Sequence, residues 1–261
     1  ALWCERKQPA RKYQVVDSLK AETREINYDK PGDPRTERVA WVFQADGKGA
    51  AACPSDLTGK TYATDRLDWS ADSRLLRSEY IRRGFTGHGV VAYDVKTGGW
   101  RKLFAEEDPK FVYSFNARYR HDLSEELTLW ASERTGWNHL YAMDLRNGQT
   151  LRAVTSGQWV VKQVVHLDAE AKEIYFQAVG RNPGENPYHQ HLCKVGLDGN
   201  GFIDLTPGDA HHEVTFSPDR RTFIETASRV DQPHAYLLRS AKDGRLLARL
   251  GATDDADLRK T

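Results

Sequence analysis

The stretch HLYAMDLRNGQTLRAVT, residues 139–155, decides the fold class because it indicates a strand, a tight turn and a second strand. Its Asn147-Gly148 dipeptide favours the positive-φ geometry of short hairpin turns. Equivalent turn glycines recur 45 to 51 residues apart, and each follows a short apolar or aromatic run. Such a recurrence is typical of a repeat fold. The turn glycines are Gly47, Gly98, Gly148, Gly199 and Gly244.

Two further landmarks share this period. An apolar residue followed by Thr comes after the turn in three units, and Leu103-Phe104 holds the same place in another. A polar turn followed by an apolar strand also recurs, as in the run FSPDRRTFI. The apolar-Thr pairs are Leu57-Thr58, Val154-Thr155 and Leu205-Thr206, and the polar turns lie in 68–76, 120–130, 166–176 and 216–224.

The repeat predicts an all-β fold, a β-propeller of about five four-stranded blades of about 50 residues each, which form part of a larger ring. No window carries a sustained helical stripe of apolar residues, and the best helical candidates are 19–26 and 253–259. The alternative is a β-sandwich with coincidental spacing. We place the blades at 13–60, 62–105, 111–157, 158–207 and 208–250, within one partial propeller domain over 1–261.

Composition excludes several classes of protein. The 38 basic and 37 acidic residues leave a net charge of +1, whereas nucleic-acid-binding proteins carry a concentrated basic surplus. The longest apolar run, Val39 to Phe43, is far shorter than the roughly 20 residues of a membrane span. We therefore predict no nucleic-acid partner and no membrane span. The cysteines, interpreted as ordinary free thiols because their spacing fits neither zinc nor a disulfide framework, are Cys4, Cys53 and Cys193.

The chain begins ALWCERKQPARK, without Met and without an apolar leader segment. No signal peptide is therefore visible in it. We expect residue 1 to be a processing site or an artificial boundary, and the sequence itself leaves the localisation open.

The chain resembles the N-terminal propeller region of the dipeptidyl peptidase IV family, especially its bacterial members. The strongest motif is SERTGWNHLY, residues 132–141. The first part fits through VVDSLKAETREINYDKPGDP, residues 15–34, with its extended stretch containing Pro-Gly. The other runs that carry the resemblance, in order and spacing, are WASERTGWNHLYAMD, VTSGQWVV, IYFQAVGRNPGENPYHQHLCKVGLDG, LTPGDAHHEVTFSPD, TASRVDQPHAYLLRSAKDG and LGATDDADL.

The resemblance implies a two-part serine exopeptidase of the prolyl oligopeptidase class. In that family an eight-bladed propeller caps an α/β-hydrolase domain that carries Ser, Asp and His. A peptide enters the chamber between them, and a dipeptide is released after Pro or Ala at the second position. A glutamate pair in the propeller binds the free amino group. The resemblance thus implies a chain that shapes the chamber and gates access, in a periplasmic or secreted parent.

The sequence departs from that plan in three ways. It contains no Gly-x-Ser-x-Gly nucleophile elbow, so we expect the chain alone to be non-catalytic. It holds about five blades in place of eight. The glutamate pair is expected upstream of residues 1–40, and the hydrolase domain after Leu258, with 251–261 as the start of the connection. We interpret Glu106-Glu107 and Glu125-Glu126 as solvated charges in turns between strands.

The aromatic and basic stretch FVYSFNARYRH, residues 111–121, corresponds to a loop that projects toward the substrate chamber in the family. Phe115 is the candidate aromatic group, with Arg118 and Tyr119 nearby. The alternative is a blade loop with ordinary packing.

The SERTGWNHLY run is predicted to be structural. Ser132 lacks the sharp strand-to-helix turn that exposes a nucleophile. We expect Trp137 to pack its ring between adjacent blades, which would stabilise the fold by roughly 2–3 kcal/mol. The structural residues assigned to this motif are Ser132, Glu133, Arg134, Gly136, Trp137 and His139.

Two histidine clusters raise the question of a metal site. His189 and His191 share a face if they lie on a strand, and His211-His212-Glu213 adds a carboxylate. The resemblance places both clusters on blade strands, so we predict a structural role, no metal site and no cofactor.

Two rival functions stay open at this point. One is a stand-alone propeller that serves as a protein-interaction scaffold, and the other is a propeller hydrolase such as a sugar-active enzyme. The partners we expect are the peptide substrate of the parent enzyme and the missing α/β-hydrolase domain. Because part of a ring leaves open blade edges, a homo-oligomer formed through those edges is also expected.

Overall fold

The structure is a computed structural model that describes residues 1–9, 11–17, 19–20, 22–30, 32–113, 118–254 and 256, without the side chain of residue 65. The chain divides into two units, Ala1–Val112 and Tyr113–Thr261, which are described separately. The regular secondary structure described in both units is almost entirely antiparallel β-strand. The single helix in these residues is α1, the one-turn segment Ser55–Thr58.

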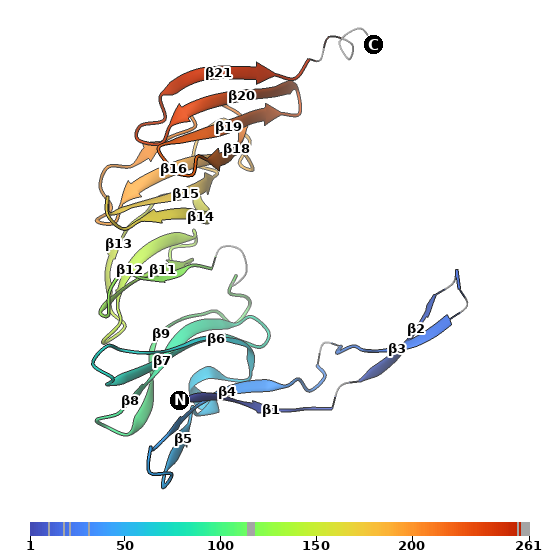
Figure 1. Cartoon of the computed structure of the whole chain (residues 1–261), viewed down its shortest axis with the longest axis vertical. Coiled ribbons are helices and arrows are strands. Elements are labelled where there is room, and N and C mark those ends of the chain that lie inside the picture. Colours follow the sequence, from blue (N-terminus) through green and yellow to red (C-terminus); the bar gives the residue numbers. More distant parts are fainter. Residues whose placement is uncertain are drawn as a thin grey trace. The chain divides into compact units, whose positions relative to one another are not determined.

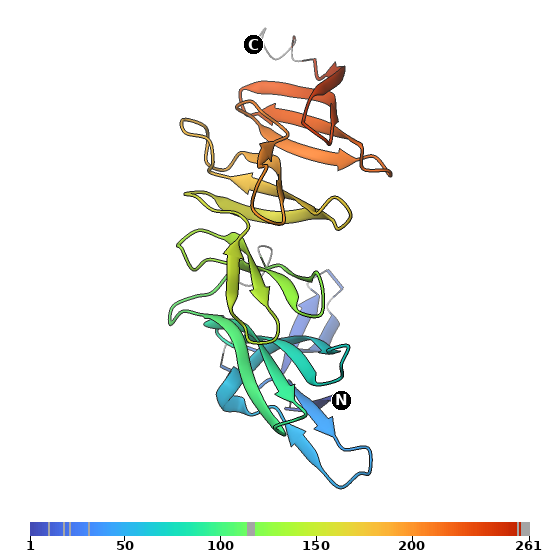
Figure 2. The same ribbon diagram turned by 90° about the vertical axis from the view of Figure 1, so that its left-hand side faces the viewer.

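The second unit contains three four-stranded antiparallel sheets, which follow one another along the chain (Figures 1 and 2). Within each sheet the strands are neighbours in sequence order, as the up-and-down strand order of a propeller blade requires. The strands are β10 Arg120–Asp122, β11 Leu127–Ser132, β12 His139–Asp144 and β13 Thr150–Ala153; β14 Val160–Asp168, β15 Glu173–Val179, β16 Gln190–Gly196 and β17 Ile203–Asp204; and β18 His211–Phe216, β19 Thr222–Arg229, β20 Gln232–Ser240 and β21 Leu246–Ala252.

The core of this unit lies between successive sheets. One cluster joins the sheet β10–β13 to the sheet β14–β17 through fully buried side chains such as Leu129, Leu140 and Phe176. A second cluster joins β14–β17 to β18–β21 through Leu192 and Phe223. Burial of apolar area between the sheets is therefore what holds them in sequence.

The recurring apolar-Thr pairs have a structural reason in this unit. The hydroxyl of Thr155, which is buried, accepts a hydrogen bond from the backbone N–H of Leu140 at 3.0 Å. The hydroxyl of Thr206 accepts one from the N–H of Leu192 at 2.8 Å in the next sheet. Each Thr hydroxyl thus supplies a hydrogen-bond acceptor near the beginning of the third strand of its sheet. Without it, a buried backbone N–H at that place would have no partner.

The first unit contains a four-stranded sheet, a three-stranded sheet and a separate hairpin in the part of the chain that the structure describes. The hairpin, β2–β3, lies away from the other strands of this unit (Figure 1). The four-stranded sheet holds β6 Thr61–Trp69, β7 Leu75–Arg82, β8 Gly87–Asp94 and β9 Gly99–Glu107; the three-stranded sheet holds β1 Leu2–Arg6, β4 Glu37–Phe43 and β5 Ala50–Ala52; and the hairpin holds β2 Lys12–Asp17 and β3 Glu22–Asn27.

The first predicted blade, 13–60, is therefore wrong in composition. Its second strand is β1, where Leu2 pairs with Trp41 and Arg6 pairs with Glu37. Strands β2 and β3, which fill the first part of this range, pair only with each other and not with β4 or β5. The sheet has three strands in place of the expected four.

The helical candidate at 19–26 is not a helix, because Glu22–Asn27 is strand β3. Tyr13 lies opposite Ile26 in the hairpin, and the ammonium of Lys12 bonds the carboxylate of Glu25 across the strands at 3.1 Å. Cross-strand pairs of this kind stabilise a strand that local propensity leaves undecided. The second helical candidate, 253–259, lies mostly outside the described residues. Among those that are described, no helix is long and apolar enough to cross a membrane.

Candidate functional site

The segment expected to reach a substrate chamber lies just before β10. Phe115 falls outside the described residues, and Arg118 is half-buried. Tyr119 is half-buried too, packs against the first core cluster, and accepts a hydrogen bond at its carbonyl from the N–H of Ala131 at 2.9 Å. Its ring stacks on that of His121 with centroids 6.3 Å apart, and burial raises the pKa of the Tyr119 hydroxyl to about 12. Tyr119 is thus a packing residue and a neutral phenol.

A neighbouring arginine has its charge paired within the sheet. The guanidinium of Arg120 donates to both carboxylate oxygens of Asp122, at 3.1 and 2.9 Å, and the Arg120 side chain is almost fully buried. A two-pronged pair of this kind fixes the orientation of both groups. The charge of Arg120 is therefore paired with that of Asp122, which lies on the same strand.

The serine of the SERTGWNHLY motif faces a guanidinium. The hydroxyl of Ser132 accepts hydrogen bonds from the backbone N–H of Arg134 at 3.2 Å and from its Nε at 2.8 Å. The Arg134 guanidinium lies 4.3 Å from the ring centroid of Tyr141 and also donates to Thr150. A nucleophilic serine needs a base that takes its proton, and an arginine cannot serve as one. Ser132 therefore holds the hairpin between β11 and β12.

The end of the same motif ties two sheets together. The side-chain amide of Asn138 donates to the carbonyl of Val161 at 2.7 Å, and the N–H of Val161 donates back to the Asn138 carbonyl at 2.8 Å. His139, which is fully buried, shares a hydrogen bond with the Thr155 hydroxyl at 3.0 Å. The reciprocal pair fixes the register in which β14 follows the preceding sheet.

The expectation that Trp137 is a buried wedge between blades is wrong, because the residue is 39% exposed. It follows the turn in which the N–H of Gly136 donates to the carbonyl of Glu133 at 2.8 Å. The tryptophan between the sheets is Trp159, which is buried. Its ring lies at a right angle to that of His139, with centroids 4.7 Å apart, and stacks on that of Phe176, with centroids 5.9 Å apart.

Sequence reasoning missed Trp159, although the run VTSGQWVV contained a signal for it. Gly157 adopts a φ of +133°, and a Cβ at that position would lie 2.4 Å from Nε1 of Trp159. Only glycine fits both the backbone angle and the close approach of the indole. A Gly two residues before a Trp, one residue after an apolar-Thr pair, is the pattern that indicates this tryptophan.

His191 and His212 are buried, form hydrogen bonds within or next to their own sheets, and meet ring to ring between two neighbouring sheets. His191 lies 2.9 Å from a carboxylate oxygen of Glu185 and 3.0 Å from the carbonyl of Thr206. His212 lies 2.5 Å from Glu225 and 3.0 Å from the carbonyl of Gly208. The two imidazole rings pack with centroids 4.8 Å apart. These rings join β16 to β18 across two neighbouring sheets.

The other members of the histidine clusters make weaker or separate contacts. His189 lies 3.2 Å from the carboxylate of Asp209, while burial and the charge of Lys162 lower the pKa of His211. Glu213 is exposed. Over the described ranges of the chain, no group of three or more His, Cys, Asp or Glu side chains is arranged to hold a metal ion.

The two Glu-Glu pairs differ from each other in the structure. The sequence predicted a turn at Glu106-Glu107. The structure places this pair at the end of strand β9 instead. Glu107 bonds Arg82 at 2.8 Å and Lys102 at 2.7 Å, and these hydrogen bonds and charges outweigh burial and lower its pKa. Glu125-Glu126 lies in the turn between β10 and β11, where Glu126 pairs with Arg146 at the surface.

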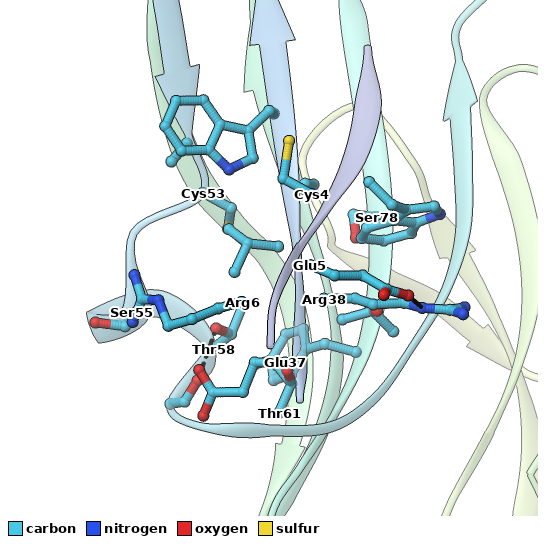
Figure 3. Close-up of a pocket in the computed structure, with 18 residues that line it drawn as sticks. Cys4, Glu5, Arg6, Glu37, Arg38, Cys53, Ser55, Thr58, Thr61 and Ser78 are labelled. Carbon is cyan, nitrogen blue, oxygen red and sulfur yellow. Dashed lines mark hydrogen bonds and ion pairs between the residues drawn. The ribbon is translucent and has the colours of Figure 1, made fainter. Parts of the chain in front are cut away.

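A cavity of about 410 Å³ in the first unit lies beside β1 and is lined by residues of β1, β4, α1, β6 and β7 (Figure 3). Tyr80 and Thr64 are among the residues that line it, and Tyr80 is almost fully buried. Burial raises the pKa of the Tyr80 hydroxyl to about 12 and, with a smaller effect of the Asp56 charge, raises that of the Cys53 thiol to about 12. The Cys53 thiol is therefore protonated and weakly reactive at neutral pH.

No sequence motif pointed to this cavity, because its lining comes from short segments that lie far apart in the sequence. Cys4 and Cys53 both line it and are free thiols, as is the buried Cys193 elsewhere in the chain.

The profile of a family described as "Dipeptidyl peptidase IV (DPP IV) N-terminal region" matches residues 6–234. This chain belongs to that family. Curated proteins named "Dipeptidyl peptidase 4" from Trichophyton equinum and Trichophyton tonsurans are each 27% identical to it over 134 residues. The alignment covers 49% of this chain and only 16% of either relative.

Solved structures of the same family share the fold of this DPP IV N-terminal region. A protein described as a dipeptidyl aminopeptidase IV from Bacteroides ovatus ATCC 8483 superposes with a TM-score of 0.69 at 19% identity, over 98% of this chain and 38% of that one. Porphyromonas gingivalis dipeptidyl peptidase 4 superposes with a TM-score of 0.68 at 17% identity, over 96% of this chain and 35% of that one. The chain is thus an all-β propeller region that spans well under half the length of these relatives.

Within this DPP IV N-terminal region, the SERTGWNHLY motif is the hairpin between the second and third strands of its sheet. Its polar groups bond to one another and to the following sheet, as Ser132 and Asn138 show. The motif that most resembles the family is therefore one that positions neighbouring blades.

Proposed function

We propose that this DPP IV N-terminal region is the non-catalytic propeller part of a dipeptidyl peptidase IV-like serine exopeptidase. In the parent enzyme it shapes the substrate chamber and limits access to peptides, which are cleaved after Pro or Ala at the second position. The observation that carries the proposal is the family match over residues 6–234, together with sheets whose strands follow the order of propeller blades.

The chemistry of the described side chains supports a structural role for the motifs. The Ser132 hydroxyl is held by Arg134, and the carboxylate of Glu225 is held by His212 and Arg239. Side chains that hydrogen-bond or pair with each other in this way hold neighbouring strands in place. We propose that the nucleophile, its base and the acid come from an α/β-hydrolase domain of the parent enzyme, and that no metal or cofactor takes part.

The substrate-facing part of the chain is proposed to be the segment that leads into β10. Phe115 supplies the aromatic contact and Arg118 the basic one, whereas Tyr119 packs against the core and positions the segment. Phe115→Ala in the full-length enzyme should raise KM for a Gly-Pro substrate with little change in stability. Unchanged peptide kinetics would remove Phe115 from the chamber, and Tyr119→Phe serves as the control because it keeps the packed ring.

The parent protein is proposed to be periplasmic or secreted, and copies of the chain are proposed to associate through open blade edges. Light scattering that shows a strict monomer would contradict the association. The full-length coding sequence tests the main proposal, which requires Gly-x-Ser-x-Gly, then Asp and His, in a domain of its own. A coding sequence without them would favour an interaction scaffold.

A further inference from the structure

Two buried histidines meet between the sheets β14–β17 and β18–β21. The rings of His191 on β16 and His212 on β18 lie with centroids 4.8 Å apart and an interplanar angle of 50°. Both side chains are only 2% exposed. Because solvent does not reach the rings, the protein groups around each nitrogen decide how many protons a ring carries.

Both nitrogens of His212 face hydrogen-bond acceptors. Nε2 lies 3.0 Å from the carbonyl oxygen of Gly208, and Nδ1 lies 2.5 Å from one carboxylate oxygen of Glu225. The other oxygen of Glu225 accepts a hydrogen bond from Nε of Arg239. Burial alone would raise the pKa of Glu225, but the hydrogen bonds and charges of these two partners outweigh it and lower the pKa. A carbonyl oxygen and an ionised carboxylate only accept, so both nitrogens of His212 must donate.

The nitrogens of His191 also have acceptors as their nearest partners. Nδ1 lies 3.0 Å from the carbonyl oxygen of Thr206 and 3.6 Å from the carboxylate of Asp204, and Nε2 lies 2.9 Å from a carboxylate oxygen of Glu185. The amide nitrogen of Asn182 is 3.4 Å from Nε2, but it lies closer to both oxygens of Glu185, at 3.1 Å each. A ring with a proton on each nitrogen satisfies this set of partners.

His139 holds the corresponding place in the preceding sheet and has a different partner. His139 and His191 both lie at the beginning of the third strand of their sheet. Nε2 of His139 donates to the carbonyl of Gly157 at 2.9 Å, while Nδ1 lies 3.0 Å from the hydroxyl of Thr155, which can donate as well as accept. A neutral ring therefore suits the place of His139, whereas a charged ring suits that of His191.

We propose that His191 and His212 are both positively charged at neutral pH and form a pH-sensitive joint between the two sheets. Nearby carboxylates offset the two charges, and two of these carboxylates also pair with an arginine. The carboxylates are Glu185, Asp204 and Glu225, and the arginines are Arg181 and Arg239. The sequence neighbours His189 and His211 interact instead with each other and with Asp209, Lys162 and Glu213.

This joint should weaken as the pH rises. A ring that loses a proton turns a bare nitrogen toward a carbonyl or carboxylate oxygen, which leaves a buried polar contact without a hydrogen bond. A histidine of the unfolded chain loses its proton near about pH 6.5, whereas the joint keeps its protons above that pH. The folded chain then binds more protons than the unfolded chain, so stability falls with rising pH. The direction is opposite to the one expected from the neutral ring of His139.

Nitrogen-15 NMR spectra of the imidazole rings in the 261-residue chain at about pH 7.5 test the charge directly. Both nitrogens of His191 and both nitrogens of His212 should carry hydrogen. His139 in the same sample is the internal control and should show one nitrogen with hydrogen and one without. A bare nitrogen in the ring of either His191 or His212 would overturn the proposal. The spectra need no substitution, so they do not depend on whether a variant folds.

Urea unfolding at about pH 7 and about pH 8.5 tests the joint. Between these values the equilibrium constant for unfolding should rise about ten-fold in the unchanged chain. The rise should be at least about three-fold smaller in His191→Gln and in His212→Gln, since each variant keeps only one charged ring. His234→Gln is the matched control, because it replaces an exposed histidine on β20, in the sheet of His212, and its rise should equal that of the unchanged chain. Equal rises in all of these proteins would overturn the joint.

Discussion

His139 donates a hydrogen bond from Nε2 to the backbone carbonyl of Gly157 at 2.9 Å. The bond joins the beginning of β12 to the connection that leads into β14, so it links two successive sheets of the DPP IV N-terminal region. The same imidazole packs at a right angle to the ring of Trp159, which makes it part of the core between those sheets. The geometry of neighbouring blades thus depends on a few residues around one buried histidine.

Replacing this histidine tests the link directly. His139→Ala removes the hydrogen bond to the Gly157 carbonyl and one of the two hydrogen bonds of the Thr155 hydroxyl, and it leaves a cavity beside Trp159. We expect the free energy of unfolding to fall by about 2–4 kcal/mol, measured by urea denaturation. A loss below about 0.5 kcal/mol would show that the ring does not hold the sheets together.

The two tryptophans near this link should differ sharply. Trp159→Ala empties the core between the sheets and should cost about 3–5 kcal/mol of stability. Trp137→Ala removes a ring that is 39% exposed and should cost less than about 1.5 kcal/mol. Urea denaturation of the two variants side by side decides between Trp159 and Trp137 as the wedge, and the reverse order would restore Trp137 to that role.

Gly157 is expected to tolerate no side chain. Gly157→Ala combines a φ of +133° with a contact of 2.4 Å to the indole of Trp159, so it should destabilise the chain by more than about 2 kcal/mol. Gly136→Ala is the matched control, because its φ is +86° but nothing lies within 4 Å of the added Cβ. Equal losses of stability in the two variants would mean that the contact with Trp159 adds nothing to backbone strain.

Acid should weaken the link at His139. Burial lowers the pKa of His139, and the hydrogen bond to the Gly157 carbonyl opposes only part of that effect. The unfolded chain therefore binds this proton first as the pH falls, so stability is full above about pH 6.5 and declines below it. Urea midpoints at several pH values should show a smaller decline between pH 7 and 5.5 for His139→Gln than for the unchanged chain. Parallel declines would assign the effect to other groups.

A second decline is expected at lower pH from Glu225. Burial alone would raise the pKa of this carboxyl, but hydrogen bonds from His212 and Arg239 and their charges outweigh it and leave the pKa below its usual value. The stability that Glu225 contributes is thus present above about pH 4.5 and is lost as the pH falls through the lowered pKa. Glu225→Gln should lose about 3 kcal/mol at pH 7, because the partners stay buried and the charge is gone. A loss under about 1 kcal/mol at pH 7 would contradict this account.

The turn glycines and apolar-Thr pairs made the β-repeat predictable because each marks a local backbone requirement. Thr155 closes a strand beginning, and Gly148 lies in a turn with a φ of +79°. The first sheet was not predictable in this way, since Leu2 pairs with Trp41 across the inserted hairpin and no local pattern encodes that distant pairing.

The candidate sites were predictable only in part, for a related reason. The motif around Ser132 and His139 was found because it is continuous in sequence, yet the burial of its tryptophan was assigned to the wrong ring. The cavity beside β1, with Tyr80 and Thr64, exists only once distant strands pair. Short-range sequence spacing therefore predicts turns and the residues at strand ends. The aromatic residues packed between sheets and the cavities cannot be predicted in this way, because they depend on how the sheets pack.

The central claim is that this DPP IV N-terminal region is the non-catalytic part of a serine exopeptidase. The most direct measurement compares hydrolysis of a chromogenic Gly-Pro substrate by the purified 261-residue chain and by the full-length protein. The account predicts turnover by the full-length protein and none by the chain at the same concentration. Turnover by the chain alone, or its absence from the full-length protein, would contradict the account.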